Sequence, residues 1–181
     1  GEAGLAQIAT AASTVPSVFL RLSPGVDAAA LRDALAAVRV TTGLCANPGF
    51  LRWTDGESPF ATAAFAAGRF VVQDPAAFAA AAAVPCHAGD TVIDLCAAPG
   101  TKTTWLAPQV RPGGIVHAYD SDAVRRRRID ENVARLGLQD VVRVAASPAD
   151  LPVADAVLVD APCSNSGVLG RRVEVRRRLA P

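Results

Sequence analysis

Short apolar runs alternate with more polar segments in the second half of the chain. Four of these runs have the length of buried strands: residues 91–96, 115–120, 141–145 and 156–160. Helices are expected between them, at residues 101–106 and 123–136. Strands that alternate with helices are typical of βαβ units, so the pattern predicts an α/β fold with a Rossmann-like parallel sheet.

The first third of the chain has a different pattern, which predicts a small α/β lobe. Residues 15–22 are expected to form a strand, and residues 27–40 a helix that begins at an acidic cap. That helix carries three apolar residues on one face: Leu31, Leu35 and Val38. The Gly-, Pro- and Asn-rich stretch at residues 42–59 predicts loops or short strands.

A strand at residues 70–73 and an alanine-rich helix at residues 74–84 connect the two patterns. Asp74 suits the N-cap of that helix because a proline follows it at the first turn. The sequence therefore predicts a small lobe at residues 1–70 and a larger domain at residues 71–181. The sheet of the larger domain is expected to stop after its fourth strand.

The two helices of the larger domain have recognisable ends. Pro108 and the turn at residues 111–114 are expected to end the first, and Gly137 suits the position just after the second. The second helix contains four consecutive arginines at residues 125–128, with acidic residues three and four positions away. A solvated helix face is favoured over RNA contact for this run.

Composition excludes several classes of protein. With 51% hydrophobic and 19% charged residues over 181 positions, the chain is too apolar to be disordered. Its net charge of +1 excludes a globally basic nucleic-acid binder. No apolar stretch approaches the roughly 20 residues that span a membrane, which favours a soluble protein. The cysteine usage favours a reduced, cytoplasmic setting.

The spacing of the cysteines and the absence of methionine are both informative. The four cysteines show no C-x-x-C spacing, so neither a metal site nor a disulfide framework is indicated. The chain begins with Gly1 and contains no methionine, so we expect it to be a piece of a longer protein.

The strongest local motif is DLCAAPGTKTT at residues 94–104, a strand that runs through small residues into a helix. Small residues let a ligand approach the backbone at the carboxyl end of a parallel strand, so a nucleotide-like ligand is expected here. A phosphate-binding P-loop is disfavoured because Cys96 and Thr101 occupy the positions of its two glycines. The dinucleotide pattern G-x-G-x-x-G is absent as well.

A carboxylate at the end of the next strand supports a nucleoside ligand. Asp120 follows Gly100 by twenty positions, where an acidic side chain can accept hydrogen bonds from ribose hydroxyls. The alternative is that Asp120 only caps the following helix, a role that Asp122 suits equally well.

The second motif is VLVDAPCSNSGVLGRR at residues 157–172, which leaves a strand through Asp160. Cys163 suits a nucleophile if Arg171 and Arg172 fold back to provide a positive surrounding. A lone cysteine is more often an inert packing residue, so its proximity to a nucleotide loop is what favours a catalytic role.

These motifs together resemble those of the RNA (cytosine-C5)-methyltransferases of the Fmu/Sun type, which depend on S-adenosylmethionine. The resemblance rests on five features: DLCAAPGTKT, the strand-end Asp120, DAPCSNSG, the RR-x-E-x-R run at residues 171–176 and the G-x-F-x-V-Q-D element at residues 68–74. It covers roughly residues 15–178. It implies a class I methyltransferase sheet, truncated after the fourth strand, beside a small N-terminal α/β lobe.

The resemblance assigns roles residue by residue. It implies that seven residues form the S-adenosylmethionine loop: Cys96, Ala97, Ala98, Pro99, Gly100, Thr101 and Lys102. Asp120 corresponds to the acidic residue that holds the cofactor ribose, and Asp160 to the aspartate between cofactor and target base. Cys163 corresponds to the cysteine of the family's Pro-Cys motif.

The implied reaction makes chemical sense for these residue types. Cytosine C5 is a poor nucleophile until a thiolate adds to C6, after which C5 can attack an electrophilic methyl group. An acidic group such as Asp160 near N3 and the exocyclic nitrogen stabilises the charge that develops in the adduct. The target cytosine must leave its stack in the RNA to enter the site.

The sequence departs from the family pattern at several positions. In the family the attacking thiol belongs to a later Thr-Cys motif, expected downstream of Pro181, while the cysteine at the place of Cys163 helps to release the product. Ser147 stands where the third strand usually ends in an aspartate, and Asp150 comes three residues late. Thr101 replaces a common glycine.

The function implied by the resemblance is methylation of cytosine C5 in RNA, with ribosomal RNA first and transfer RNA second among substrates, by a parent protein that is monomeric. Arg171, Arg172 and Arg176 are the candidates for phosphate contact. The alternative is a catalytically inactive cofactor- or RNA-binding fragment that lacks the nucleophilic cysteine.

Overall fold

The computed structural model describes residues 17–162, which contain two four-stranded sheets. The first sheet has the strand order β2-β3-β1-β4, and all its pairs are antiparallel. Its elements, in chain order, are β1 (Val18–Leu22), α2 (Ala28–Ala36), β2 (Val40–Leu44), β3 (Phe50–Gly56), the 3-10 helix η1 (Pro59–Ala61), α3 (Ala63–Ala66) and β4 (Phe70–Val72). This βαββαβ order is that of a ferredoxin-like unit.

The helix α2 is shorter than its periodicity predicts. Asp27 caps it as expected, accepting a hydrogen bond from the Ala30 backbone N–H at 2.7 Å. Leu31 and Leu35 are buried, but the helix ends at Ala36, and Val38 is 50% exposed. The backbone turns through Arg39, whose φ is +63°, and this turn takes Val38 off the apolar face.

Residues 42–59 contain more regular structure than the prediction of loops or short strands indicates. Most of this stretch forms β2 and the seven-residue β3, which pair along most of their length. β3 then pairs with β1 through Leu51 opposite Leu20, and both of these side chains are fully buried. Long-range pairing and burial therefore outweigh the local Gly and Pro signals.

The second sheet is parallel and has the strand order β7-β6-β5-β8, which confirms the predicted Rossmann-like arrangement. Its elements and the preceding helix, in chain order, are α4 (Pro75–Ala82), β5 (Thr91–Asp94), α5 (Thr103–Gln109), β6 (Ile115–Ala118), α6 (Ala123–Arg135), β7 (Val142–Val144), the 3-10 helix η2 (Pro148–Asp150) and β8 (Ala156–Leu158). All four predicted strands are present, each somewhat shorter than expected.

The end signals of the helices are confirmed in all but one case. Asp74 caps α4 through the Ala76 N–H at 2.8 Å, and Gly137 has a φ of +66° just beyond α6. Pro108 does not end α5 as predicted, because it lies inside that helix. A proline in the last turn removes only one intrahelical hydrogen bond, and the helix continues to Gln109.

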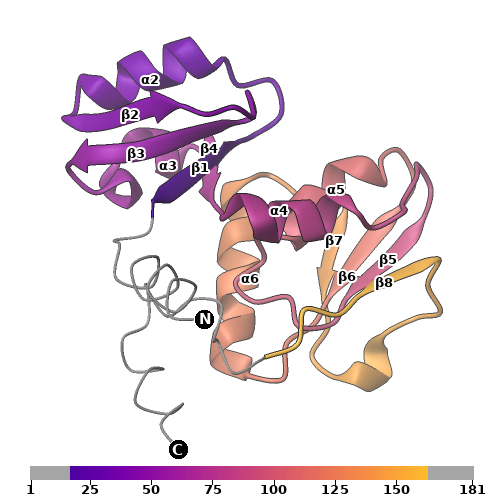
Figure 1. The fold of residues 1–181 in the computed structure, drawn as a ribbon. Coiled ribbons are helices and arrows are strands. Elements are labelled where there is room, and N and C mark those ends of the chain that lie inside the picture. Colours follow the sequence, from indigo (N-terminus) through magenta and orange to yellow (C-terminus); the bar gives the residue numbers. More distant parts are fainter. Residues whose placement is uncertain (1–16, 163–181) are drawn as a thin grey trace, which may run out of the picture. The chain divides into compact units, whose positions relative to one another are not determined.

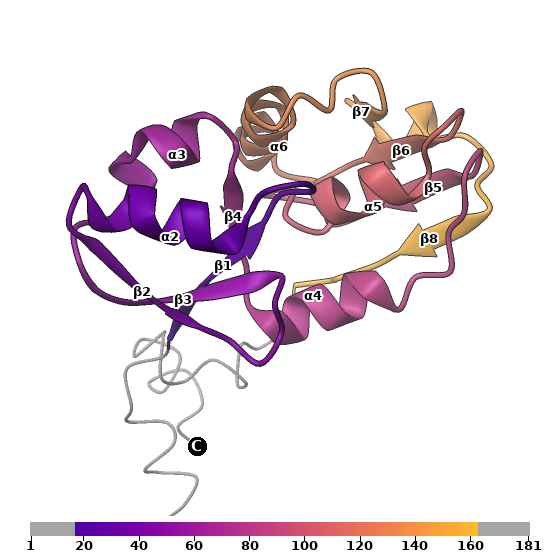
Figure 2. The same ribbon diagram turned by 90° about the horizontal axis from the view of Figure 1, so that it is seen from above.

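Helices α4, α5 and α6 lie between the first sheet and the strands of the second in both views (Figures 1 and 2). Aromatic rings join the layers: Phe78 of α4 contacts Phe50 of β3 at 5.2 Å and Trp105 of α5 at 4.6 Å between centroids. The predicted division after residue 70 falls within β4, which belongs to the first sheet, and the two-domain assignment stays a prediction.

Each sheet has its own apolar core. The core of the first sheet is formed by Leu20, Leu31, Leu35, Val40, Leu51 and Phe70. The core of the second includes Val92, Leu106, Val110, Val116, Ile129 and Val142. No helix within residues 17–162 has the length and apolar character needed to cross a membrane.

Candidate functional site

The predicted loop at Cys96–Lys102 leaves the carboxyl end of β5 and turns back toward α5. The Ala97 N–H donates to the Tyr119 carbonyl at 2.8 Å, which ties the loop to the chain after β6. Gly100 has a φ of +96°, and a Cβ there would lie 3.3 Å from Cγ2 of Ile129. Glycine at this position therefore lets the loop lie directly against α6.

Asp120 follows β6 and is almost fully buried, at 3% exposure. Its carboxylate accepts hydrogen bonds from the backbone N–H groups of Ala98 at 3.3 Å and Asp122 at 3.1 Å. Asp122, not Asp120, caps α6, through the N–H groups of Val124 and Arg125. The alternative role of Asp120 as a simple helix cap is therefore wrong.

The arginine run of α6 is only partly the solvated face that its pattern predicts. Arg125 pairs with the Asp120 carboxylate at 3.3 Å and donates to the Ala98 carbonyl at 3.2 Å. Arg126 donates to the Asp120 carbonyl at 2.5 Å, whereas Arg127 and Arg128 are exposed. The first two arginines face the loop because the capped start of α6 lies beside it.

Asn132 of α6 makes a further contact to the loop that the sequence did not indicate. Its side-chain Nδ2 donates to the Pro99 carbonyl at 2.8 Å. A polar residue in the middle of a helix is usually solvent-exposed, so no sequence signal distinguished Asn132 from its neighbours. Arg125 and Asn132 together hold the backbone of the loop from the α6 side.

Asp94 ends β5 and lies beneath the loop at 1% exposure, a second residue that was not singled out. Its Oδ2 accepts a hydrogen bond from Thr103 Oγ1 at 2.7 Å, while its Oδ1 has no hydrogen-bond partner within residues 17–162. Burial raises the pKa of Asp94 to about 6, and the Thr103 hydrogen bond and the Lys102 charge partly oppose that rise. The signal that could have identified it is its position as the last residue of a buried strand, at the start of the motif.

Lys102 and Asp160 bring the two motif loops together. The ammonium group of Lys102, after β5, forms an ion pair with the carboxylate of Asp160, after β8. The Lys102 side chain is 14% exposed and that of Asp160 is 57% exposed, so the carboxylate stays open to solvent on one side. This contact confirms that the two motifs, nearly sixty residues apart, share one end of the sheet.

Cys96, the cysteine of the first motif, is a half-buried free thiol. Burial, followed by the nearby carboxylates of Asp120 and Asp94, raises the pKa of the Cys96 thiol. A raised pKa keeps Cys96 protonated near neutral pH, which does not suit a nucleophile. Cys163 lies outside the described residues, as do the predicted RNA contacts Arg171, Arg172 and Arg176.

Ser147 and Asp150 form a local cap after β7. Asp150 Oδ2 accepts a hydrogen bond from the Ser147 backbone N–H at 2.9 Å, and Ser147 Oγ accepts one from the Ala149 N–H at 3.2 Å. Together they make the capping box of η2. The carboxylate of Asp150, three residues after the strand-end position of Ser147, is thus engaged with the backbone.

Taken together, the carboxyl ends of β5, β6 and β8 hold three acidic side chains around a loop of small residues. Asp120 and Asp160 supply hydrogen-bond acceptors and negative charge. Acceptors and negative charge suit a ligand that carries both hydroxyl groups and a positive charge, bound at the carboxyl edge of a parallel sheet.

Comparison with known families identifies the chain. Residues 81–181 match the model of the family described as 16S rRNA methyltransferase RsmB/F. The matched region contains both motif loops and the whole parallel sheet. The chain belongs to the RsmB/F family.

Curated RsmB/F relatives extend the match toward the amino terminus. The chain is 32% identical over 165 residues to ribosomal RNA small subunit methyltransferase B of Sodalis glossinidius, which covers 87% of this chain and 35% of that protein. It is 38% identical over 117 residues to the protein of the same name from Salmonella arizonae, covering 62% of this chain and 27% of the relative. The chain therefore spans between 27% and 35% of the length of these relatives.

Solved structures agree with the RsmB/F assignment. The crystal structure of PH0851 matches with a TM-score of 0.80 and 31% identity, over 91% of this chain and 39% of that one. A methyltransferase homologue from Pyrococcus horikoshii matches with a TM-score of 0.74 and 28% identity, over 95% of this chain and 59% of that one. These matches confirm the class I methyltransferase fold.

Proposed function

We propose that this protein transfers a methyl group from S-adenosylmethionine to C5 of cytosine in RNA, with ribosomal RNA as the substrate. Membership of the RsmB/F family supports the reaction class, and the name of the curated relatives supports the substrate. The observation that carries the proposal is the Lys102–Asp160 ion pair, because it joins the loop that would hold the cofactor to the loop that would meet the base.

The donor set is compatible with S-adenosylmethionine. This cofactor carries a ribose diol, an adenine and positive charges on its sulfonium and amino groups, and its sulfonium supplies an electrophilic methyl group when bound. Asp120, held by two backbone N–H groups, offers a fixed carboxylate to the ribose hydroxyls. Asp94 and Asp160 add negative charge at the same edge, which favours a cation.

Asp160 is proposed to act on the cytosine. Its carboxylate is oriented by Lys102 and is more than half exposed, so it can accept a hydrogen bond from the exocyclic amino group while Lys102 holds it in place. Cys163 is proposed to assist release of the methylated base, and the attacking thiolate is expected from a Thr-Cys motif downstream of Pro181. Cys96, with its raised pKa, is not assigned to either step.

The proposal extends to the setting of the parent protein. Transfer RNA is the second substrate to test, because its single-stranded loops present unstacked cytosines to the same kind of site. Arg171, Arg172 and Arg176 are proposed to contact RNA phosphates. A cytoplasmic, monomeric parent is consistent with an enzyme that acts on ribosomal RNA.

Cofactor binding is tested by isothermal titration of the 181-residue chain with S-adenosylmethionine. Asp120→Asn is expected to weaken binding by at least about tenfold, since a neutral amide replaces a charged acceptor of two hydroxyl hydrogen bonds. The matched control is Asp150→Asn, which removes a carboxylate from the next strand end but leaves the loop intact. Equal affinity in the wild type and Asp120→Asn contradicts the cofactor assignment, provided that both fold.

Methyl transfer is tested with radiolabelled cofactor and a 16S rRNA transcript, using a chain extended through the downstream region. Asp160→Asn is expected to reduce kcat by about 100-fold or more while cofactor affinity changes less. If the Asp160→Asn variant transfers label to the RNA at the wild-type rate, the proposed role of Asp160 is contradicted. Cofactor binding without any transfer by the extended wild type supports an inactive binding protein instead.

A further inference from the structure

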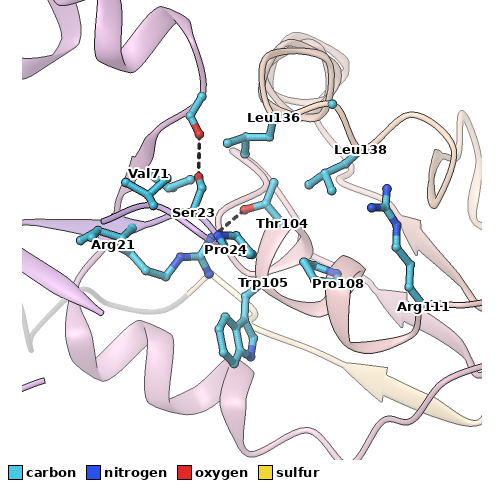
Figure 3. A pocket seen from close by; sticks show the side chains of 14 residues that line it. Arg21, Ser23, Pro24, Val71, Thr104, Trp105, Pro108, Arg111, Leu136 and Leu138 are labelled. Carbon is cyan, nitrogen blue, oxygen red and sulfur yellow. Dashed lines mark hydrogen bonds between the residues drawn. The ribbon is translucent and has the colours of Figure 1, made fainter. Parts of the chain in front are cut away.

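The side chain of Arg21 extends from β1 of the first sheet to the start of α5. Its Nη2 donates to Thr104 Oγ1 at 3.0 Å, and Figure 3 shows this hydrogen bond as a dashed line. Arg21 is only 5% exposed, and its Cζ lies 5.6 Å from the centre of the Trp105 ring. A cavity of about 590 Å³ lies beside this contact, but Nη1 is buried and Nη2 is engaged, so the guanidinium acts on the protein itself.

The hydroxyl of Thr104 connects Arg21 to the motif loop. A hydroxyl has one hydrogen, and since a guanidinium can only donate, Thr104 accepts from Arg21 and directs its own hydrogen elsewhere. Its Oγ1 donates to the Thr101 carbonyl at 3.0 Å, and its backbone N–H donates to the Gly100 carbonyl at 2.9 Å. Thr104 therefore holds the two loop residues that come directly before Lys102.

The first turn of α5 is held from both sides. Thr103 is fully buried and donates to the Asp94 carboxylate of the second sheet at 2.7 Å. Thr104, the next residue, accepts its hydrogen bond from the first sheet. Lys102 lies immediately before this pair, and its ammonium group forms the ion pair with Asp160. The position of Lys102 thus depends on hydrogen bonds to both sheets.

Stability alone does not account for a charged side chain at position 21. Burial lowers the pKa of Arg21 to about 10, so its guanidinium is charged at neutral pH. Within residues 17–162 no carboxylate pairs with it, and its Nη1 has no hydrogen-bond partner. One hydrogen bond and one ring contact offset only part of the penalty for burying an unpaired charge. An apolar side chain of similar length is therefore expected to stabilise the fold equally well, and the hydrogen bond to Thr104 is what arginine adds.

We propose that Arg21 and Thr104 are positioning residues of the cofactor site, which hold the Cys96–Lys102 loop in the conformation that binds S-adenosylmethionine. The inference rests on the proposed function. Arg21 acts through the Thr104 hydroxyl and the loop backbone. Hydrogen bonds in such a chain strengthen one another, because each donor polarises the next group. Cofactor affinity is thus expected to depend on a residue of the first sheet.

The test is isothermal titration of the 181-residue chain with S-adenosylmethionine, together with urea unfolding in its absence. Arg21→Met is expected to bind the cofactor at least about fivefold more weakly, while its free energy of unfolding is unchanged or higher. Arg21→Lys keeps a donor for Thr104 and is expected to lie between Arg21→Met and the wild type. The control Arg52→Met, at an exposed arginine of β3, should change neither quantity. Lower stability of Arg21→Met with unchanged cofactor affinity indicates a purely structural role and overturns the proposal.

Variants of Thr104 test the same connection while keeping the arginine. Thr104→Val removes the hydroxyl and is expected to weaken cofactor binding at least about fivefold, whereas Thr104→Ser keeps it and should stay within about twofold of the wild type. In the double variant Arg21→Met/Thr104→Val the loss should not exceed that of Thr104→Val, because both changes break one chain of hydrogen bonds. Losses that multiply contradict a shared chain. Equal affinities of Thr104→Val and Thr104→Ser overturn the proposal even if Arg21→Met does not fold.

The outcomes separate this inference from the proposed function. If the wild type does not bind S-adenosylmethionine, the proposed function and the positioning role are both contradicted. If the wild type binds and both Arg21→Met and Thr104→Val bind with the same affinity, the cofactor assignment stands and only the positioning role is overturned.

Discussion

The carboxyl group of Asp94 makes the stability of the protein depend on pH. Its pKa is about 6 in the folded chain and 3.8 in the unfolded chain, so the folded state binds a proton more tightly. The contribution of Asp94 to stability is therefore complete below pH 4 and is lost as the pH rises through about 6. A shift of this size corresponds to about 3 kcal/mol.

Asp94→Asn is expected to remove this dependence. Relative to the variant, the wild type should lose on the order of 3 kcal/mol of unfolding free energy between pH 4 and pH 7, because asparagine never becomes charged. Urea unfolding at both pH values measures the difference. The control Asp33→Asn replaces an exposed carboxylate and should change little. A pH profile of Asp94→Asn parallel to that of the wild type contradicts a buried titrating carboxyl at this position.

The sequence located site residues correctly where they lie at the end of a predicted strand. Asp120 and Asp160 were expected at strand ends, and both lie there. Asp94 and Arg125 were missed as site residues because their importance comes from burial and from the packing of α6 on the loop. The spacing of residues in a motif predicts neither how deeply Asp94 is buried nor which face of α6 packs against the loop.

At the scale of elements, α6 is anchored to the α3–β4 connection by a single side chain. Arg135 donates to the carbonyls of Phe65 at 2.8 Å and Phe70 at 3.1 Å, and its guanidinium lies 3.9 Å from the Phe65 ring centre. Gly68 makes the approach possible, since a Cβ there would lie 2.5 Å from the Arg135 carbonyl oxygen. The end of α6 is thus held against the first sheet.

Arg135→Lys is expected to destabilise the protein by about 1–3 kcal/mol, because an ammonium group cannot serve both carbonyls and the ring in the same geometry. Chemical denaturation measures the change. Arg128→Lys in the exposed part of the same helix is the control and should stay within about 0.5 kcal/mol of the wild type. Gly68→Ala should be destabilising as well, through its close backbone contact. Equal stability of the two lysine variants would show that the anchor is dispensable.

The elements themselves were largely predictable, and the exceptions have physical causes. Strong alternation of apolar runs located all four parallel strands. The stretch at residues 42–59 was underestimated because β2 and β3 depend on pairing with each other and with β1. The end of α5 was predicted too early at Pro108, because a proline near the end of a short helix reduces the stability of that helix only slightly.

At the scale of the described residues as a whole, the two sheets share an aromatic seam. Phe50, Phe78 and Trp105 form consecutive edge-to-face contacts from β3 through α4 to α5. Residues on different elements that share one buried interface usually unfold together. Residues 18–160 are accordingly expected to unfold as one cooperative unit.

The two tryptophans report on different parts of the described residues. Trp53 lies on β3 and Trp105 on α5. In the variants Trp53→Phe and Trp105→Phe, the remaining tryptophan fluorescence and the far-ultraviolet circular dichroism should follow the same urea transition within each variant. The wild type, in which both fluorophores are present, serves as the reference. A fluorescence midpoint that departs from the circular dichroism midpoint in either variant contradicts shared unfolding.

The contact between the sheets could not be predicted from sequence. Phe50, Phe78 and Trp105 lie in three elements with no common spacing, and their encounter depends on how α4 and α5 cover the first sheet. The sequence predicted a small lobe, a parallel sheet and the connecting segment at residues 70–84. Only tertiary packing specifies which faces meet.

The hydroxyl of Thr104 has a consequence for chimeric enzymes. It accepts a hydrogen bond from Arg21 and donates one to the Thr101 carbonyl at 3.0 Å, so a residue of the first sheet shares an atom with the motif loop. Consider a chimera that takes residues 18–72 from one relative and the remainder from another. Its loop should keep its structure only if position 21 is arginine and position 104 is a residue with a hydroxyl group. Position 104 is thus a compatibility marker for recombining the two halves.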